Sequence, residues 1–98
     1  MTIGIGSSAL KWFKEEVGMK TGDKVKFYPQ IYGSSPVQGS FAIGFSVDNT
    51  PIDMVVHTEI EGLTFYIEST DLWFFDEHDL QVDYNEEKDE LEFSYTKS

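Results

Sequence analysis

Cysteine is absent from this sequence of 98 residues. Without a thiol, the chain can form no disulfide, no zinc finger and no thiolate-held cluster through its own side chains. Any metal would have to bind through oxygen or imidazole. Arginine is absent too, which removes the bidentate guanidinium contacts that recognise phosphate.

Positive charge is scarce in general. Seven lysines face 18 acidic residues, and the net charge is −11. Residues 1–50 carry five lysines and four acids, whereas residues 51–98 carry two lysines and fourteen acids. Nucleic-acid binding needs cations to neutralise phosphates, so this composition excludes nucleic acid as a partner. The acidic second half indicates a well-solvated surface more than a site for a basic partner.

Long hydrophobic runs are also missing. No stretch approaches the ~18 apolar residues needed to span a bilayer, and the first residues lack a basic n-region. We therefore expect a cytoplasmic protein without membrane contact. The length predicts a single domain over residues 1–98, and fifteen aromatic residues are available for one compact core.

Hydrophobic periodicity predicts a mainly β, α+β fold. Ser7–Gly18 has a serine start signal, apolar residues at helical spacing and a glycine stop, so we expect an N-terminal helix there. Ser69–Phe75 predicts a second, short helix with a Ser or Thr cap. Pro29 lies inside the first predicted strand and indicates an edge strand or a bulge. The alternating segments predict six strands: Lys24–Ile31, Phe41–Val47, Met54–Glu59, Leu63–Glu68, Leu80–Tyr84 and Glu90–Tyr95.

The loop between the first two predicted strands reads YGSSPVQGS over residues 32–40. A hydrolase using Ser34 or Ser35 would need a base oriented by an acid, and the only histidines are His57 and His78. No G-x-S-x-G sequence is present either. We therefore expect a serine and proline turn, no catalytic residue and no enzyme activity.

The second candidate is the row Asp76-Glu77-His78-Asp79, four side chains that can each bind a metal. Consecutive residues do not generally converge on one ion, and EF-hand spacing is absent. We expect an exposed turn between a helix and a strand. For His57 we expect a partly buried, hydrogen-bonded imidazole. The run Trp73–Phe75 predicts at least one exposed aromatic, because one short helix cannot bury three rings on a single face.

The order of these segments resembles the HesB-like family, also called IscA-like or A-type iron–sulfur carriers. The resemblance covers about residues 2–95. It implies a mixed β-sandwich with an N-terminal helix. The matching points are an opening strand and helix over Ile3–Val17, the loop Gly33-Ser34-Ser35, the strand Phe41–Val47, the segment Glu61–Ile67, Leu72, Phe75-Asp76 and Leu80–Tyr84.

In cluster-binding members of that family, three cysteines hold the iron or the cluster. The resemblance puts Ser34 at the first of these positions, and the chain offers no counterpart of the pair in the tail. Serine does not replace a thiolate as an iron ligand. We therefore expect the HesB-like fold without a cluster, a metal or another cofactor, and protein partners or a homodimer.

Two functions remain open at this stage. The first is that of an accessory or protein-binding factor related to iron–sulfur cluster assembly that is not itself a carrier. The alternative is that of a small acidic protein that binds a metal or another ligand through carboxylate and imidazole groups.

Overall fold

The computed structural model describes residues 1–31, 41–75 and 78–97, and these residues form two β-sheets with short helical segments. The mainly β prediction is confirmed, and a seventh strand, Ile3–Ile5, is the opening strand that the family resemblance implied. The elements are β1 (Ile3–Ile5), α1 (Ser7–Trp12), η1 (Phe13–Val17), β2 (Lys24–Ile31), β3 (Phe41–Val47), β4 (Met54–Ile60), β5 (Leu63–Glu68), η2 (Ser69–Asp71), α2 (Leu72–Phe75), β6 (His78–Asn85) and β7 (Glu90–Lys97).

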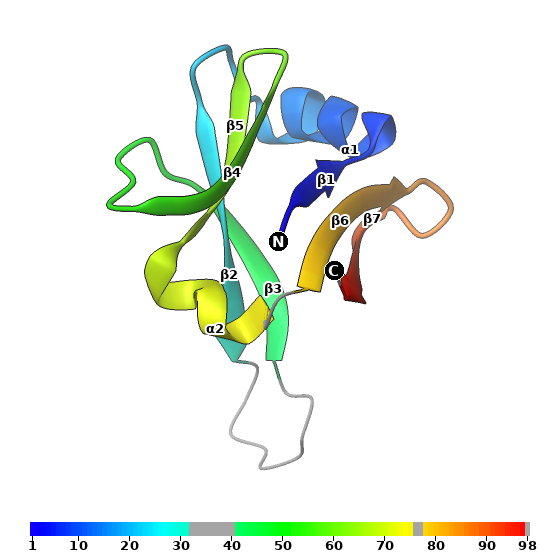
Figure 1. Ribbon diagram of the computed structural model, residues 1–98. Coiled ribbons are helices and arrows are strands. Elements are labelled where there is room, and N and C mark those ends of the chain that lie inside the picture. The colour runs from blue at the N-terminus through cyan, green and yellow to red at the C-terminus, as the bar shows by residue number, and fades with distance from the viewer. Residues whose placement is uncertain (32–40, 76–77, 98) are drawn as a thin grey trace.

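The two sheets pack against each other around one hydrophobic cluster. One sheet has the strand order β1-β6-β7 and the other β3-β2-β5-β4. Figure 1 shows them facing each other, with α1 lying across one end of both. The fully buried residues of this core are mainly aromatic and β-branched, as expected for a pleated surface. They include Phe13, Val25, Phe27, Phe65, Ile67 and Val82.

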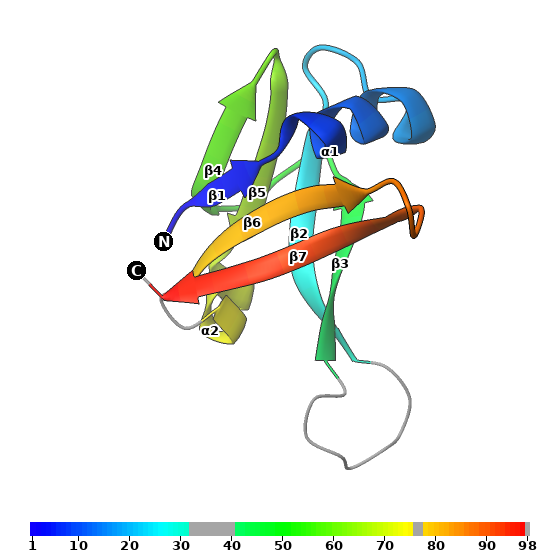
Figure 2. The ribbon, with the colours of Figure 1, turned by 90° about the vertical axis from the view of Figure 1, so that its right-hand side faces the viewer.

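Strand β1 pairs with β6, which lies about 77 residues further along the sequence. It runs parallel to β6, with Ile3 opposite Leu80 and Ile5 opposite Val82. The backbone N–H of Leu80 donates to the carbonyl of Thr2 at 2.9 Å. Figure 2 shows β1 and β6 side by side, with β7 completing the sheet.

The prediction that Pro29 indicates an edge strand or a bulge is wrong, because β2 is an inner strand of its sheet and its register with β3 runs through Pro29 without a shift. This strand lies between β3 and β5. Its pairing with β5 covers only Lys24–Lys26, however, whereas its pairing with β3 continues through Pro29. The missing N–H of the proline thus falls beyond the part of β2 that bonds to β5, and it interrupts no β2–β5 pairing.

Both predicted helices are present, and the predicted glycine stop of the first is confirmed, but neither helix has a Ser or Thr at its N-terminal cap. The first begins after Gly6, which makes no side-chain cap bond, and its last five residues form a π-helix that ends at left-handed Gly18 (φ 78°). The second consists of a 3-10 turn followed by one α-turn, with Glu68 at the cap position. No helix in the described ranges is long and apolar enough to cross a membrane.

Candidate functional site

The two sites that the sequence singled out fall largely outside the described residues. The loop with Ser34 and Ser35, including the position of the first family cysteine, lies outside them, as do Asp76 and Glu77. What the structure places are His57, His78 and Asp79. The expectations for Ser34 and for Asp76 and Glu77 therefore stay predictions. The expected exposed turn is wrong for His78 and Asp79, which are half-buried residues of β6 and pair with β7.

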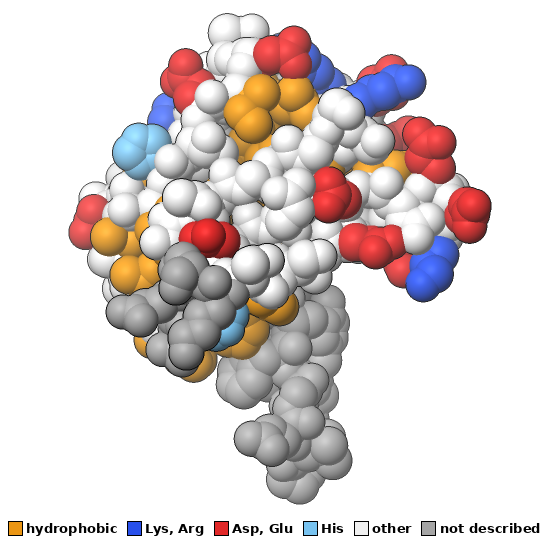
Figure 3. Space-filling model, turned by 45° about the vertical axis from the view of Figure 1, so that its right-hand side comes forward, with side chains coloured by type: hydrophobic (Ala, Val, Ile, Leu, Met, Phe, Trp, Pro, Cys, Tyr) orange, Lys and Arg blue, Asp and Glu red, His pale blue; other side chains and the backbone are white. Residues whose placement is uncertain are grey.

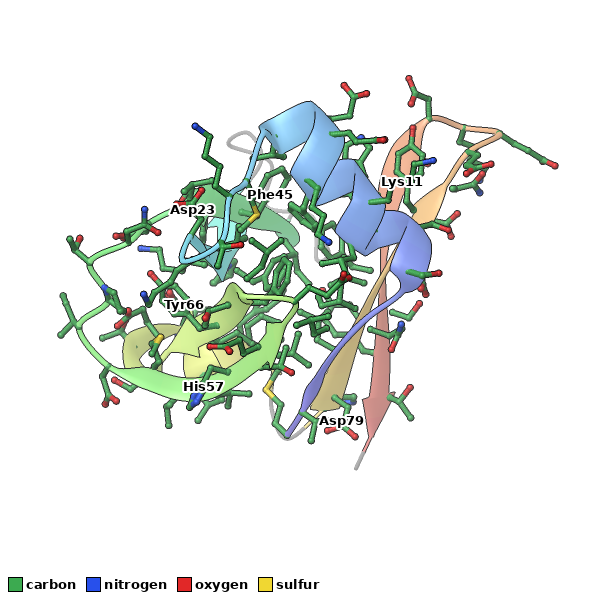
Figure 4. The ribbon with its side chains drawn as sticks, turned by 90° about the horizontal axis from the view of Figure 1, so that it is seen from above. Lys11, Asp23, Phe45, His57, Tyr66 and Asp79 are labelled. Atoms are coloured by element: carbon green, nitrogen blue, oxygen red, sulfur yellow. The ribbon has the colours of Figure 1, made fainter. Side chains whose placement is uncertain are left out.

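The two histidines and Asp79 each contact a different part of the backbone and do not form one site. Nδ1 of His78 lies 2.9 Å from the carbonyl oxygen of Phe75, and Asp79 accepts a bond of 2.7 Å from the N–H of Thr2. The expectation for His57 is wrong in one respect: its imidazole is exposed on the outer side of β4 (Figure 4). Nδ1 of His57 is 3.3 Å from the carbonyl of Met54.

Metal-capable side chains do not gather in the part of the chain that is described. No group of three or more Asp, Glu or His side chains there is placed to hold a metal ion. The alternative of a carboxylate and imidazole site thus gains no support from these residues.

A different feature emerges at the loop of residues 48–53, which joins β3 to β4. Glu68, at the end of β5, is only 7 % exposed, although an acid at that point of an alternating strand reads as solvent-facing. Its two carboxylate oxygens accept the N–H groups of Ile52 at 3.0 Å and Asp53 at 2.9 Å. A charged acceptor makes these bonds stronger than neutral ones. Glu68 therefore holds the second half of the loop.

The first half of the loop is held by Asp48 and Tyr66. The buried hydroxyl of Tyr66 donates to the carbonyl of Asp48 at 3.0 Å. Burial, followed by the negative charges of Asp48 and Glu68, raises the pKa of Tyr66 to about 12, so the hydroxyl keeps its proton and remains a donor at neutral pH. The Asp48 carboxylate also accepts the N–H and the hydroxyl of Thr50, at 3.0 and 2.9 Å. Tyr66 and Glu68 thus fix both ends of the loop to β5.

This fixed loop presents an apolar side chain to solvent. Ile52 is 95 % exposed. The loop is also joined to η2, since the N–H of Ser69 donates to the carbonyl of Asp53 at 3.2 Å. From η2 the chain enters α2, where Trp73 is 64 % exposed, which confirms the predicted exposed aromatic. Chemically, an ordered loop with an exposed apolar tip suits contact with another protein better than a reaction.

The acids that hold this region also make stability depend on pH. Hydrogen bonds from Thr50, first from its N–H, lower the pKa of Asp48, and bonds from the N–H of Lys20 and from Asn49 lower the pKa of Asp23. Such groups stabilise the fold fully above their ordinary pKa of 3.8 and lose that contribution as the pH falls through the lower folded values.

We therefore expect the urea midpoint to stay nearly level from pH 7 to 5 and to fall below pH 3.8. Asp48→Asn should be less stable than the parent protein at pH 7, and the difference between the two should shrink in acid. The measurement is urea unfolding followed by circular dichroism at several pH values. A difference in stability between the parent protein and Asp48→Asn that is constant from pH 7 to 2 would show that the ionisation of Asp48 is not the cause.

Relatives of known sequence resemble the whole chain. It is 44 % identical over 95 residues to the pyruvate dehydrogenase inhibitor of Bacillus subtilis, and the match covers 97 % of this chain and 99 % of that protein. It is 33 % identical over 96 residues to an uncharacterized protein of Staphylococcus saprophyticus, covering 96 % and 98 % of the two chains. No family model matches the sequence.

The structural comparison concerns the fold alone. Escherichia coli SufA, a protein involved in the biosynthesis of iron–sulfur clusters, matches with a TM-score of 0.64 at 17 % identity. The match covers 96 % of this chain and 78 % of SufA. The resemblance to the HesB-like proteins is thereby confirmed as a likeness of fold. By sequence, the chain belongs to the family that includes the Bacillus subtilis pyruvate dehydrogenase inhibitor and the Staphylococcus saprophyticus protein.

Proposed function

We propose that this protein inhibits pyruvate dehydrogenase by binding to it, and that it does so as a protein ligand without catalysing a reaction. The observation that carries the proposal is the 44 % identity, over almost the full length of both chains, to a protein named for that inhibition. An inhibitor of this kind needs a stable surface that fits its target, and it needs neither a catalytic group nor a cofactor.

The described surface supports binding of this type. The loop of residues 48–53 is held by Glu68 and Tyr66, so little conformational entropy remains to be lost there when a partner binds. Its tip and α2 expose Ile52 and Trp73, and apolar or aromatic side chains of this size are common anchors of protein interfaces.

The test is a turnover assay with purified pyruvate dehydrogenase from the organism that supplies this chain. We expect pyruvate-dependent turnover to fall in a saturable way as the protein is added, and inhibition to persist in the presence of an iron chelator because no cluster takes part. Escherichia coli SufA is the matched control, because it has the same fold and we expect it to leave turnover unchanged.

Unchanged turnover at a 100-fold molar excess of the protein would refute the proposal. Inhibition that disappears when the iron chelator is added would refute the statement that no cluster takes part. Equal inhibition by SufA would show a general property of the fold and not a property of this family.

The second candidate is an accessory role in iron–sulfur cluster assembly through protein contacts. It is supported by the SufA-like fold, a likeness at low identity that many functions can share. The same assay separates the two candidates, because a protein that acts only in cluster assembly leaves turnover of the purified enzyme unchanged.

A further inference from the structure

An open groove with an aromatic floor lies between the first helix and the β6–β7 hairpin. Trp12 and Tyr84 form its floor, and Glu15, Glu16 and Glu86 stand along its sides together with Lys11. Its volume is about 120 Å³. It continues into a wider, shallower depression that shares Tyr84 and Glu86. We call the part floored by the two rings the aromatic groove. Figure 3 shows the acidic side chains gathered around this end of the molecule.

The floor of the aromatic groove is fixed from below. The ring of Trp12 meets Phe13 edge to face at 5.3 Å and Phe45 at 5.8 Å, so the core holds it in place. It stacks on Tyr84 with 6.0 Å between ring centroids and 24° between planes. Both rings are half-buried, which leaves part of each in contact with solvent. The groove is therefore present before any ligand arrives.

The hydroxyl of Tyr84 is already used. It donates to Asp89 on the turn of the hairpin, which fixes the orientation of the ring. That hydrogen bond, then burial and the charges of Asp89, Glu16 and Glu86, raise the pKa of Tyr84 to about 12. Tyr84 thus stays neutral at physiological pH, and what it offers to the groove is its ring.

Charge decides which ligand the aromatic groove favours. Within the described part of the chain, the carboxylates of Glu15, Glu16 and Glu86 make no ion pair and no side-chain hydrogen bond. Lys11 is the one cation among the lining residues (Figure 4). The face of an aromatic ring is itself negative and attracts a cation placed over it. The partly exposed rings and the carboxylates without an ion-pair partner together favour an ammonium or a guanidinium group.

We propose that the aromatic groove binds a lysine or arginine side chain that projects from a basic segment of the inhibited enzyme. This inference rests on the proposed function, and it identifies one contact between the protein and the enzyme. A protein segment fits better than a small free cation, because sites for small molecules enclose most of their ligand. This groove instead opens into a second acidic depression, in which neighbouring residues of a chain can lie.

The first experiment compares two double variants of equal charge. Glu16→Gln/Glu86→Gln removes two carboxylates from the aromatic groove, and Glu59→Gln/Glu90→Gln removes two exposed ones that do not line it. We expect the first variant to bind immobilised pyruvate dehydrogenase about tenfold more weakly than the parent protein, as for two exposed ion pairs, with a smaller dependence on salt. The second variant should bind like the parent. Equal binding by all three would overturn the proposal.

The second experiment examines the aromatic groove without the enzyme. In a Trp73→Phe background Trp12 is the only tryptophan, and its fluorescence is followed during titration with tetralysine. We expect a saturable change that Glu16→Gln/Glu86→Gln abolishes and tetraglutamate does not produce. No response to tetralysine would refute the groove as a cation site even if the protein inhibits the enzyme. A normal response from a protein that binds no pyruvate dehydrogenase would refute the proposed function and the named partner while leaving the cation site standing.

Discussion

Replacement of Phe13 by alanine is expected to lower the free energy of unfolding by about 3–5 kcal/mol, the usual cost of removing a buried phenyl ring. Phe13 is completely buried. Its ring contacts Phe65 at 5.2 Å, Phe45 at 5.3 Å and Phe27 at 6.4 Å. These neighbours come from three strands and cannot all close on the space left behind, so a cavity should remain.

The measurement is urea unfolding at pH 7, followed by circular dichroism. Phe13→Leu is the graded control, because it keeps most of the side-chain volume and should cost clearly less than the alanine variant. A second control, Val47→Ala, changes an exposed side chain and should shift the free energy of unfolding only slightly. A loss below about 1 kcal/mol for Phe13→Ala would show that the aromatic cluster is not the centre of the core.

Glu68→Ala is expected to cost about 2 kcal/mol, because it removes two hydrogen bonds to a charged acceptor while the released N–H groups can partly turn to water. The effect should be local as well as global. Hydrogen exchange at the amides of Ile52 and Asp53 should become much faster, since these are the two donors that the carboxylate holds.

Glu68→Gln is the informative companion variant. A carboxamide keeps one acceptor oxygen, so it should retain one of the two bonds and lie between the parent protein and the alanine variant in both stability and exchange. Unchanged exchange at Ile52 and Asp53 in Glu68→Ala would show that the loop is held by other contacts. Faster exchange along all of β5 would point to damage of the sheet.

Much of the fold could be predicted from local patterns. The alternation of Leu63, Phe65 and Ile67 correctly indicated a strand with a buried apolar face. That alternation gives no indication that Thr64, Tyr66 and Glu68 on the other face are buried as well. Tyr66 and Glu68 are buried because the loop of residues 48–53 bonds to both side chains, and alternation within one strand carries no signal of a partner fifteen to eighteen residues away.

Some features of the candidate sites could likewise be predicted from the sequence, and others could not. Composition alone showed that no thiolate ligand is available, and the spacing in Trp73–Phe75 was enough to predict an exposed ring. The aromatic groove could not be anticipated, because Trp12 and Tyr84 lie far apart in the sequence and meet only when the helix packs near the β6–β7 hairpin. The Glu68-held loop has no local signature either, since an acid at the end of a strand usually faces water.

The parallel pairing of β1 with β6 also constrains how the protein can fold during synthesis. Residues 3–5 pair with residues 80–82, so β1 is synthesised long before its partner strand. Until then Ile3 has no strand to pair with, and the sheet formed by β1, β6 and β7 cannot close. Contacts between such distant parts of a chain form slowly. This sheet can therefore close only after β6 and β7 have been synthesised, whereas β2, β3, β4 and β5 can assemble before those two strands emerge.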